Sequence, residues 1–167
     1  MDEKRHGETG TMNIPAETAI LHGTAADMLE LKGKRVHQIA PDATVYDAVA
    51  LMDELRVGAL LVTKDGALAG IISERDYTRK VILMGRASRD TRVDEIMTSS
   101  LITVRPDTSL NECLQIVTDR HVRHLPVLDD RRVVGMLSIG DLVRAVVSQQ
   151  ADLIRNLKSF IGSDYPV

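Results

Sequence analysis

The chain repeats itself at an offset of 65 residues, and this constrains its fold more than any other feature. Residues 41–82 align without a gap on residues 106–147, mostly apolar on apolar. The identical pairs include Pro41/Pro106, Gly70/Gly135, Ser73/Ser138, Asp76/Asp141 and Arg79/Arg144. Two copies of one supersecondary unit are the simplest interpretation.

Each copy is predicted to fold as a β-α-β-β-α unit. Apolar residues at the i, i+3, i+4, i+7 spacing predict a helix in each copy. They are Val45, Ala48, Val49 and Met52, then Leu110, Cys113, Leu114 and Val117. Polar turns separate apolar runs at 57–62 and 67–72, and at 122–128 and 133–137, which predicts two hairpins. Helices at 74–83 and 139–149 close the units. Leading strands at 35–39, the less regular one, and at 101–104 open them.

The first helix of each copy has a start signal. Ser109-x-x-Glu112 has the pattern of a capping box, and Thr44-x-x-Asp47 is a weaker relative. Cys113 lies on the apolar stripe, so we interpret it as a small core residue rather than a nucleophile. A single cysteine also excludes an internal disulfide and a cysteine-cluster zinc site.

Composition limits the function classes. With 44% hydrophobic residues in 167, the chain can build a real core. A net charge of -3 argues against a strongly basic nucleic-acid binder, and 2% aromatic residues argue against a base-stacking platform. No apolar stretch is long enough to cross a membrane, and residues 1–15 lack the apolar segment of a secretion signal. We therefore expect a cytoplasmic protein whose first 15 residues are flexible.

The repeats resemble the CBS domain (the cystathionine beta-synthase repeat), which occurs in tandem pairs called Bateman modules. The resemblance covers residues 34–148. It is carried by segments 41–45, 58–62 and 70–76 in the first copy, and by 104–107, 123–127 and 135–141 in the second. It implies an α+β fold of two tandem repeats packed with pseudo-two-fold symmetry, plus terminal helices. The expected parts are an N-terminal extension (1–33), repeat 1 (34–90), repeat 2 (91–150) and a C-terminal helical extension (151–167).

The resemblance also implies a regulatory module that binds an adenosyl ligand between the repeats. AMP is the expected ligand, with ATP or NAD(H) as other candidates, and no metal is required. Asp76 and Asp141 would take the ribose hydroxyls, and Ser73 and Ser138 the phosphate. Apolar groups of the leading strand, Ile39 in repeat 1, would contact the adenine.

The residues of these motifs support this function independently. A carboxylate can accept both hydroxyls of a ribose diol, and a helix N-terminus attracts anions. Gly70 and Gly135 would let a ligand approach the backbone closely. The alternative is that Ser-x-x-Asp is only a reciprocal helix cap that needs no ligand.

The copies differ where a phosphate would lie. The second has Arg123-His124, and the first has Gly58-Ala59 at the aligned positions. Arg123 can give a forked, charged contact, and His124 a second donor. We therefore expect unequal sites, with a phosphate-bearing ligand favouring repeat 2. The alternative is an ordinary solvated strand end.

A basic run joins the copies. It comprises Arg75, Arg79, Lys80, Arg86, Arg89 and Arg92. It can be a solvated linker, or Arg75 or Arg79 can lean over the cleft toward a phosphate. An interaction or nucleic-acid module acting through this run is the alternative function, although nucleic-acid binding is less favoured. The chain has none of the common catalytic motifs, so we predict that it is not an enzyme.

Both ends of the chain have apolar patterns beyond the repeats. Leu142, Val146, Leu153, Leu157 and residues 160–161 continue a helical stripe, and a second helix is predicted over residues 16–31. Each apolar face needs a cover, which can be an intramolecular lid or a dimer interface. The resemblance favours a homodimer, and the sequence does not identify a regulated partner.

Overall fold

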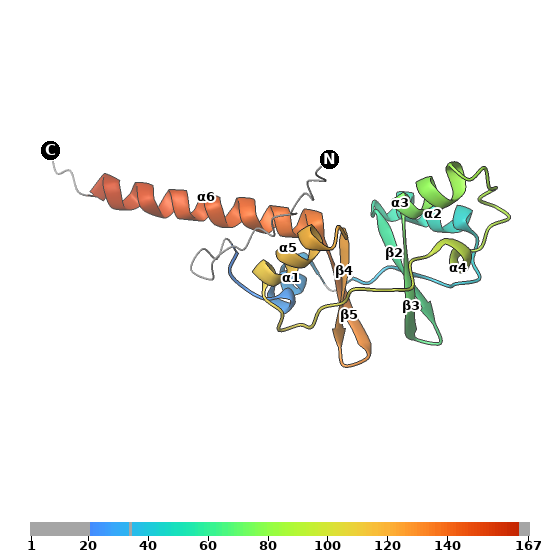
Figure 1. Cartoon of the computed structure of the whole chain (residues 1–167). Coiled ribbons are helices and arrows are strands. Elements are labelled where there is room, and N and C mark those ends of the chain that lie inside the picture. Colours follow the sequence, from blue (N-terminus) through green and yellow to red (C-terminus); the bar gives the residue numbers. More distant parts are fainter. Residues whose placement is uncertain (1–20, 34, 164–167) are drawn as a thin grey trace, which may run out of the picture.

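The computed structural model describes residues 21–33 and 35–163 (Figure 1). Repeat 1 contains β1 (Gln38–Ile39), α2 (Val45–Leu55), β2 (Ala59–Lys64), β3 (Ala67–Ser73), α3 (Glu74–Tyr77) and a π-helical turn, η2 (Thr78–Ile82). Repeat 2 contains α5 (Leu110–Asp119), β4 (His124–Asp129), β5 (Arg132–Ser138) and α6 (Ile139–Ser163). Two short helices lie outside these runs, α1 (Ala25–Lys32) and α4 (Val93–Ile96). The predicted α+β architecture of two tandem repeats is confirmed.

The duplication extends to details of the backbone. Antiparallel hairpins β2/β3 and β4/β5 each carry an irregularity at the same place, after Val62 and after Val127. Left-handed backbone also recurs at the same offset, at Asp65 and Asp130 in the hairpin turns. The strands β3 and β5 contact each other, so the two hairpins lie side by side (Figure 1).

The leading strands reverse the expected order of regularity. The first copy forms β1, which pairs in parallel with β2, whereas the second has only one bridge, between Val104 and Val127. In repeat 1 the N–H of Leu61 donates to the carbonyl of His37 at 3.0 Å. The aligned residue in repeat 2 is Pro126, which has no N–H to donate. The expectation that the first strand is the reduced one is therefore wrong.

The two short helices are exchanged between the repeats. The start of α1 packs on repeat 2, where Ala25 N–H donates to Thr108 O at 2.8 Å. The start of α4 packs on repeat 1 in the same way, with Val93 N–H donating to Ala43 O at 2.9 Å. Met28 and Leu29 of α1 lie in the hydrophobic core of repeat 2. Thus α1 is an intramolecular cover. It begins at Ala25, and residues 16–20 of the predicted helix lie outside the described part of the chain.

The last helix, α6, runs well past repeat 2 (Figure 1). Leu142 is buried against the repeat, whereas Leu153 and Leu157 further along are exposed. A second set of exposed apolar residues lies within a narrow arc of the helix. It comprises Ile139, Val143, Val147, Ile154 and Leu157. The predicted helical stripe is confirmed as a helix, and the described chain leaves its outer part uncovered.

Candidate functional site

Both motif aspartates are buried and cap the helices that follow them. The N–H and Oγ of Ser73 donate to Asp76 Oδ2 at 3.0 and 2.7 Å. The N–H and Oγ of Ser138 donate to Asp141 Oδ2 at 2.7 and 2.9 Å. Each serine hydroxyl in turn accepts the N–H of its aspartate. The helix-cap interpretation is therefore correct for both copies, and any ligand must share these carboxylates with the caps.

Each aspartate also has cationic partners. Lys80 Nζ lies 2.8 Å from Asp76 Oδ1, and Lys32 Nζ lies 2.6 Å from Asp141 Oδ2. Arg144 Nη2 donates to Asp141 Oδ1 at 2.5 Å. Burial works to raise the pKa of Asp141, but hydrogen bonds from Lys32 and Ser138 outweigh it and hold the pKa below its usual value. Asp141 is thus a charged acceptor inside a nearly closed surface.

His124 lies where the two repeats meet. A Cβ added at Gly58 would lie 4.0 Å from His124 Nε2, so the ring uses the room that the glycine leaves. Burial lowers the pKa of His124, and the charges of Asp141, Lys32, Arg123 and Asp76 act on it with opposing signs. The imidazole is therefore neutral at pH 7 and within electrostatic reach of both motif aspartates.

Arg75 also reaches across this contact. Its Nη1 donates to the carbonyl of His121 at 3.4 Å. We call the contact formed by Gly58, Arg75, Asp76, His121 and His124 the seam. The structure thus brings residues of both predicted half-sites together.

The remaining predicted site residues are placed unevenly. Arg123 is exposed beside His124, and its carbonyl accepts the N–H of Ile139 at the start of α6. Ala59 is fully buried in β2, and Ile39 packs against the core of repeat 1. Neither side chain presents an open surface for adenine in this conformation.

Gly70 and Gly135 are close-approach positions, but the chain itself makes the approach. A Cβ at Gly70 would lie 2.7 Å from Met97 Sδ and 2.9 Å from the Thr98 carbonyl. A Cβ at Gly135 would lie 2.4 Å from Leu29 Cδ2. The expectation that these glycines admit a ligand is therefore corrected: they admit the exchanged segments that carry α4 and α1.

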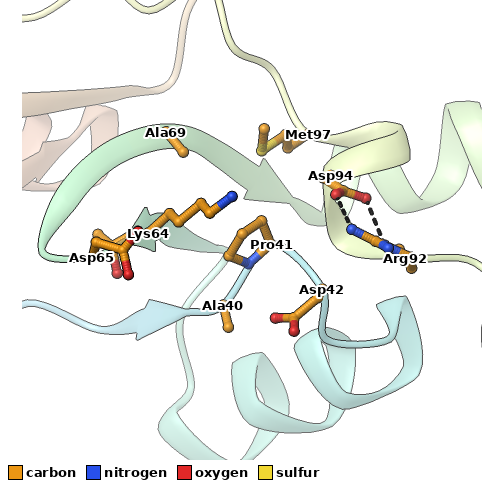
Figure 2. A pocket seen from close by; sticks show the side chains of 10 residues that line it. Ala40, Pro41, Asp42, Lys64, Asp65, Ala69, Arg92, Asp94 and Met97 are labelled. Atoms are coloured by element: carbon orange, nitrogen blue, oxygen red, sulfur yellow. Dashed lines mark hydrogen bonds and ion pairs between the residues drawn. The ribbon is translucent and has the colours of Figure 1, made fainter.

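A hollow in repeat 1 lies away from the seam (Figure 2). Its volume is about 630 Å³, and its lining includes Pro41, Lys64 and the paired Arg92 and Asp94. The hollow lies at the Lys64 end of β2, whereas Ser73 pairs with Ala59 at the other end. Five residues of strand separate the two ends by roughly 17 Å. The sequence pattern gave no indication of this hollow.

Most of the basic run is engaged within the chain. Arg86 pairs with Glu95, Arg92 pairs with Asp94, and Arg89 stacks on Tyr46 with 3.6 Å between its Cζ and the ring centroid. These contacts fit a structural linker. Among the described residues, no group of three or more His, Cys, Asp or Glu side chains could hold a metal ion.

Comparison with known proteins identifies the family. The family model of the CBS domain matches residues 30–82 and 93–148, so the chain belongs to the CBS-domain family. The CBS domain-containing protein CBSX3, mitochondrial, of Arabidopsis thaliana is 46% identical over 151 residues, which are 85% of this chain and 73% of that protein. Relatives of this kind are CBS-domain proteins, a regulatory class.

Solved structures agree with this assignment. The CBS domain NE2398 is 44% identical with a TM-score of 0.73, and the match covers 75% of this chain and 98% of that one. The CBS domain pair of protein MJ0100, solved with 5′-methylthioadenosine and S-adenosyl-L-methionine, shares the fold at 23% identity and a TM-score of 0.69. That match covers 76% of this chain and 98% of that one.

Within the part of the chain that the structure describes, no helix is both long and apolar enough to span a bilayer. The cytoplasm remains a prediction, because the name of the Arabidopsis relative assigns that protein to mitochondria.

Proposed function

We propose that this chain is a non-catalytic regulatory module that binds an adenine nucleotide at the seam, with the phosphate on repeat 2. The observation that carries the proposal is the meeting of two capped, buried aspartates with His124 and Arg75 in one contact. AMP is the proposed ligand, with ATP or NAD(H) as other candidates, and no metal is needed. The adenosyl ligands bound by the CBS pair of MJ0100 support this ligand class.

The difference between the repeats supports repeat 2 as the phosphate site. Arg123 is exposed next to His124 and can form two parallel hydrogen bonds to a phosphate. The N-terminus of α6 lies directly after Ser138 and adds a partial positive charge. Repeat 1 has Gly58 and buried Ala59 at these positions and offers no comparable group.

Regulation would follow from unequal binding to two arrangements of the repeats. Both sides of the seam contribute groups, so a ligand that joins Arg75 of repeat 1 to Arg123 of repeat 2 stabilises one relative orientation. A ligand shifts such an equilibrium only by its difference in affinity for the two states. The regulated partner is not identified by this surface.

Isothermal titration at physiological salt tests the proposal with AMP, ATP, NADH and S-adenosylmethionine. We expect saturable heat with AMP and a loss of about tenfold or more in AMP affinity for Arg123→Ala, since a charged hydrogen bond is removed. Arg131→Ala is the matched control, because Arg131 is equally exposed but lies in the turn at the far end of the β4/β5 hairpin. No heat with any of the four ligands would contradict the proposal.

We also propose that two copies pair through the exposed stripe of α6, defined as Val143, Val147, Ile154 and Leu157. These side chains are each at least half exposed, and they follow one side of a helix that leaves the repeat. A second copy brings an identical stripe, and helices with apolar residues at this spacing pack side by side.

A further inference from the structure

Repeat 1 covers its motif aspartate with backbone. Thr98, which follows α4, pairs with Ile71 of β3 in both directions, with N to O distances of 2.8 and 3.0 Å. The Thr98 hydroxyl also donates to Asp76 Oδ1 at 3.2 Å. One residue thus supplies a donor to the Ile71 carbonyl and a donor to the aspartate.

Repeat 2 fills the equivalent positions with a lysine side chain. The acceptors 65 residues further on are the carbonyl of Met136 and the carboxylate of Asp141. Lys32 Nζ donates to the first at 2.8 Å and to the second at 2.6 Å. A single ammonium group, from the last residue of α1, therefore replaces both donors of Thr98.

The two covers differ in what it takes to open them. Uncovering Asp76 requires an antiparallel backbone bridge to break. Uncovering Asp141 on the Lys32 side requires only that a flexible side chain, 30% exposed, rotates away. Ion pairs of partly exposed lysines are weak, so a ligand can replace this one.

Asp141 has no room for a ribose while Lys32 is in place. Its Oδ2 already receives three donors, two from Ser138 and one from Lys32. Arg144 occupies part of Oδ1. Because a carboxylate oxygen has two lone pairs, a diol finds no free position on Oδ2 until the lysine leaves.

We propose that Lys32 is an internal competitor for the ribose position of repeat 2, and that a nucleotide binds there by displacing its ammonium group from Asp141. This inference rests on the proposed nucleotide site. A ligand phosphate gives the displaced ammonium group a new anionic partner, whereas an uncharged nucleoside gives none. Lys32 therefore selects nucleotides over nucleosides at this site.

Titration of adenosine and AMP into wild type and Lys32→Met tests the inference. Adenosine binding should strengthen by about fivefold in the variant, since the competitor is gone. AMP should gain less, because its phosphate loses a partner, so the preference for AMP over adenosine should fall. Lys80→Met is the matched control: it removes the ion pair at Asp76 but leaves the Thr98 bridge in place, and the preference should not change.

The outcomes separate this inference from the function on which it rests. AMP binding by both proteins with unchanged adenosine affinity would overturn the role of Lys32 alone. Absence of AMP and adenosine binding in both would overturn the nucleotide site as well. If Lys32→Met does not fold, Lys32→Gln replaces it, since its amide can still donate to the Met136 carbonyl while the charge is lost.

Discussion

Asp76 and Asp141 are held by the helices that they cap, and this fixes where their charge lies. Asp141 has two cations and a serine on its carboxylate, whereas Asp76 has one cation, a threonine and a serine. Two residues of similar sequence context thus have different neighbours. The differences come from segments distant in the chain, which also determine the chemistry of His124 between them.

The depressed pKa of His124 predicts a loss of stability toward acid. Its unfolded pKa is about 6.5, and burial lowers the folded value. The neutral form therefore stabilises the fold above about pH 6.5, and this contribution is lost as pH falls through the lower folded pKa. The free energy of unfolding in urea should fall between pH 7.5 and pH 5, and His124→Gln should flatten that slope. Asp141 titrates below this window.

His121→Asn serves as the control for the pH series. His121 is exposed and has left-handed backbone, which asparagine tolerates. Its slope between pH 7.5 and pH 5 should match that of the wild type. An unchanged slope in His124→Gln would contradict the assignment.

Cys113 should be inert in the native protein. It is fully buried in the core of repeat 2, as interpreted from its position on the apolar stripe, and burial raises its pKa to about 11. The reactive thiolate is therefore scarce and inaccessible at pH 8. An aromatic disulfide reagent should label the thiol only in denaturant. Complete labelling within minutes in native buffer would show that this core is open.

The exchanged helices α1 and α4 are what most distinguishes the elements of this fold from a simple pair of hairpins. Each helix docks on the opposite repeat through a glycine that leaves room for it, Gly135 for Leu29 and Gly70 for Met97. The docking also carries Lys32 and Thr98 to the two aspartates. The covers of the candidate sites are therefore consequences of helix exchange.

Gly70→Ala should destabilise the protein by about 1–3 kcal/mol, the usual cost of an overpacked methyl group. Its Cβ would lie 2.9 Å from the Thr98 carbonyl, and that backbone cannot move without breaking its bridge to Ile71. The measurement is urea unfolding at pH 7.5. Gly140→Ala is the control, because its nearest neighbour would be at 3.6 Å and a helical alanine is favourable. Equal stabilities of the two variants would contradict the packing at Gly70.

The local elements could be predicted from the sequence, and the exchange could not. Helix α5, the hairpins and α6 follow from periodicity and turn residues that lie within each element. The exchange depends on contacts between distant segments, and its repeat signal runs at an offset of 68 rather than 65. At that offset Ala25, Met28 and Leu29 align with Val93, Ile96 and Met97. For the same reason the predicted site contained both aspartates but missed Lys32 and Thr98.

Pro126 shows how a single residue can mislead a reading of strand length. The run at 101–104 has the more regular apolar pattern, yet it forms a single bridge, because the strand that it faces has lost a donor. The missing donor lies in β4 and not in the run itself, so the pattern of the run alone could not reveal it.

At the scale of the whole molecule, the long α6 is the feature that the repeats do not account for. Its outer half leaves the two-repeat body (Figure 1), and its apolar side chains are exposed there. A solitary helix gains little stability from propensity alone, so a partner surface would supply the packing that it lacks.

Sedimentation equilibrium should show a two-chain species, and Val147→Glu with Ile154→Glu should give one chain with an unchanged fold by circular dichroism. The charges would be buried without partners in a paired stripe. Asn156→Glu is the control on the same helix, about 200° round from Ile154. A wild type that sediments as one chain at all accessible concentrations would exclude this pairing.

The crystal structure of the protein with AMP tests the central claim most directly. We expect one AMP per chain, with its phosphate on Arg123 and His124, its ribose on Asp141, and Lys32 turned away from that carboxylate. Repeat 1 should stay closed by Thr98. AMP absent from the seam at saturating concentration, or held only in the hollow beside Lys64, would contradict the claim.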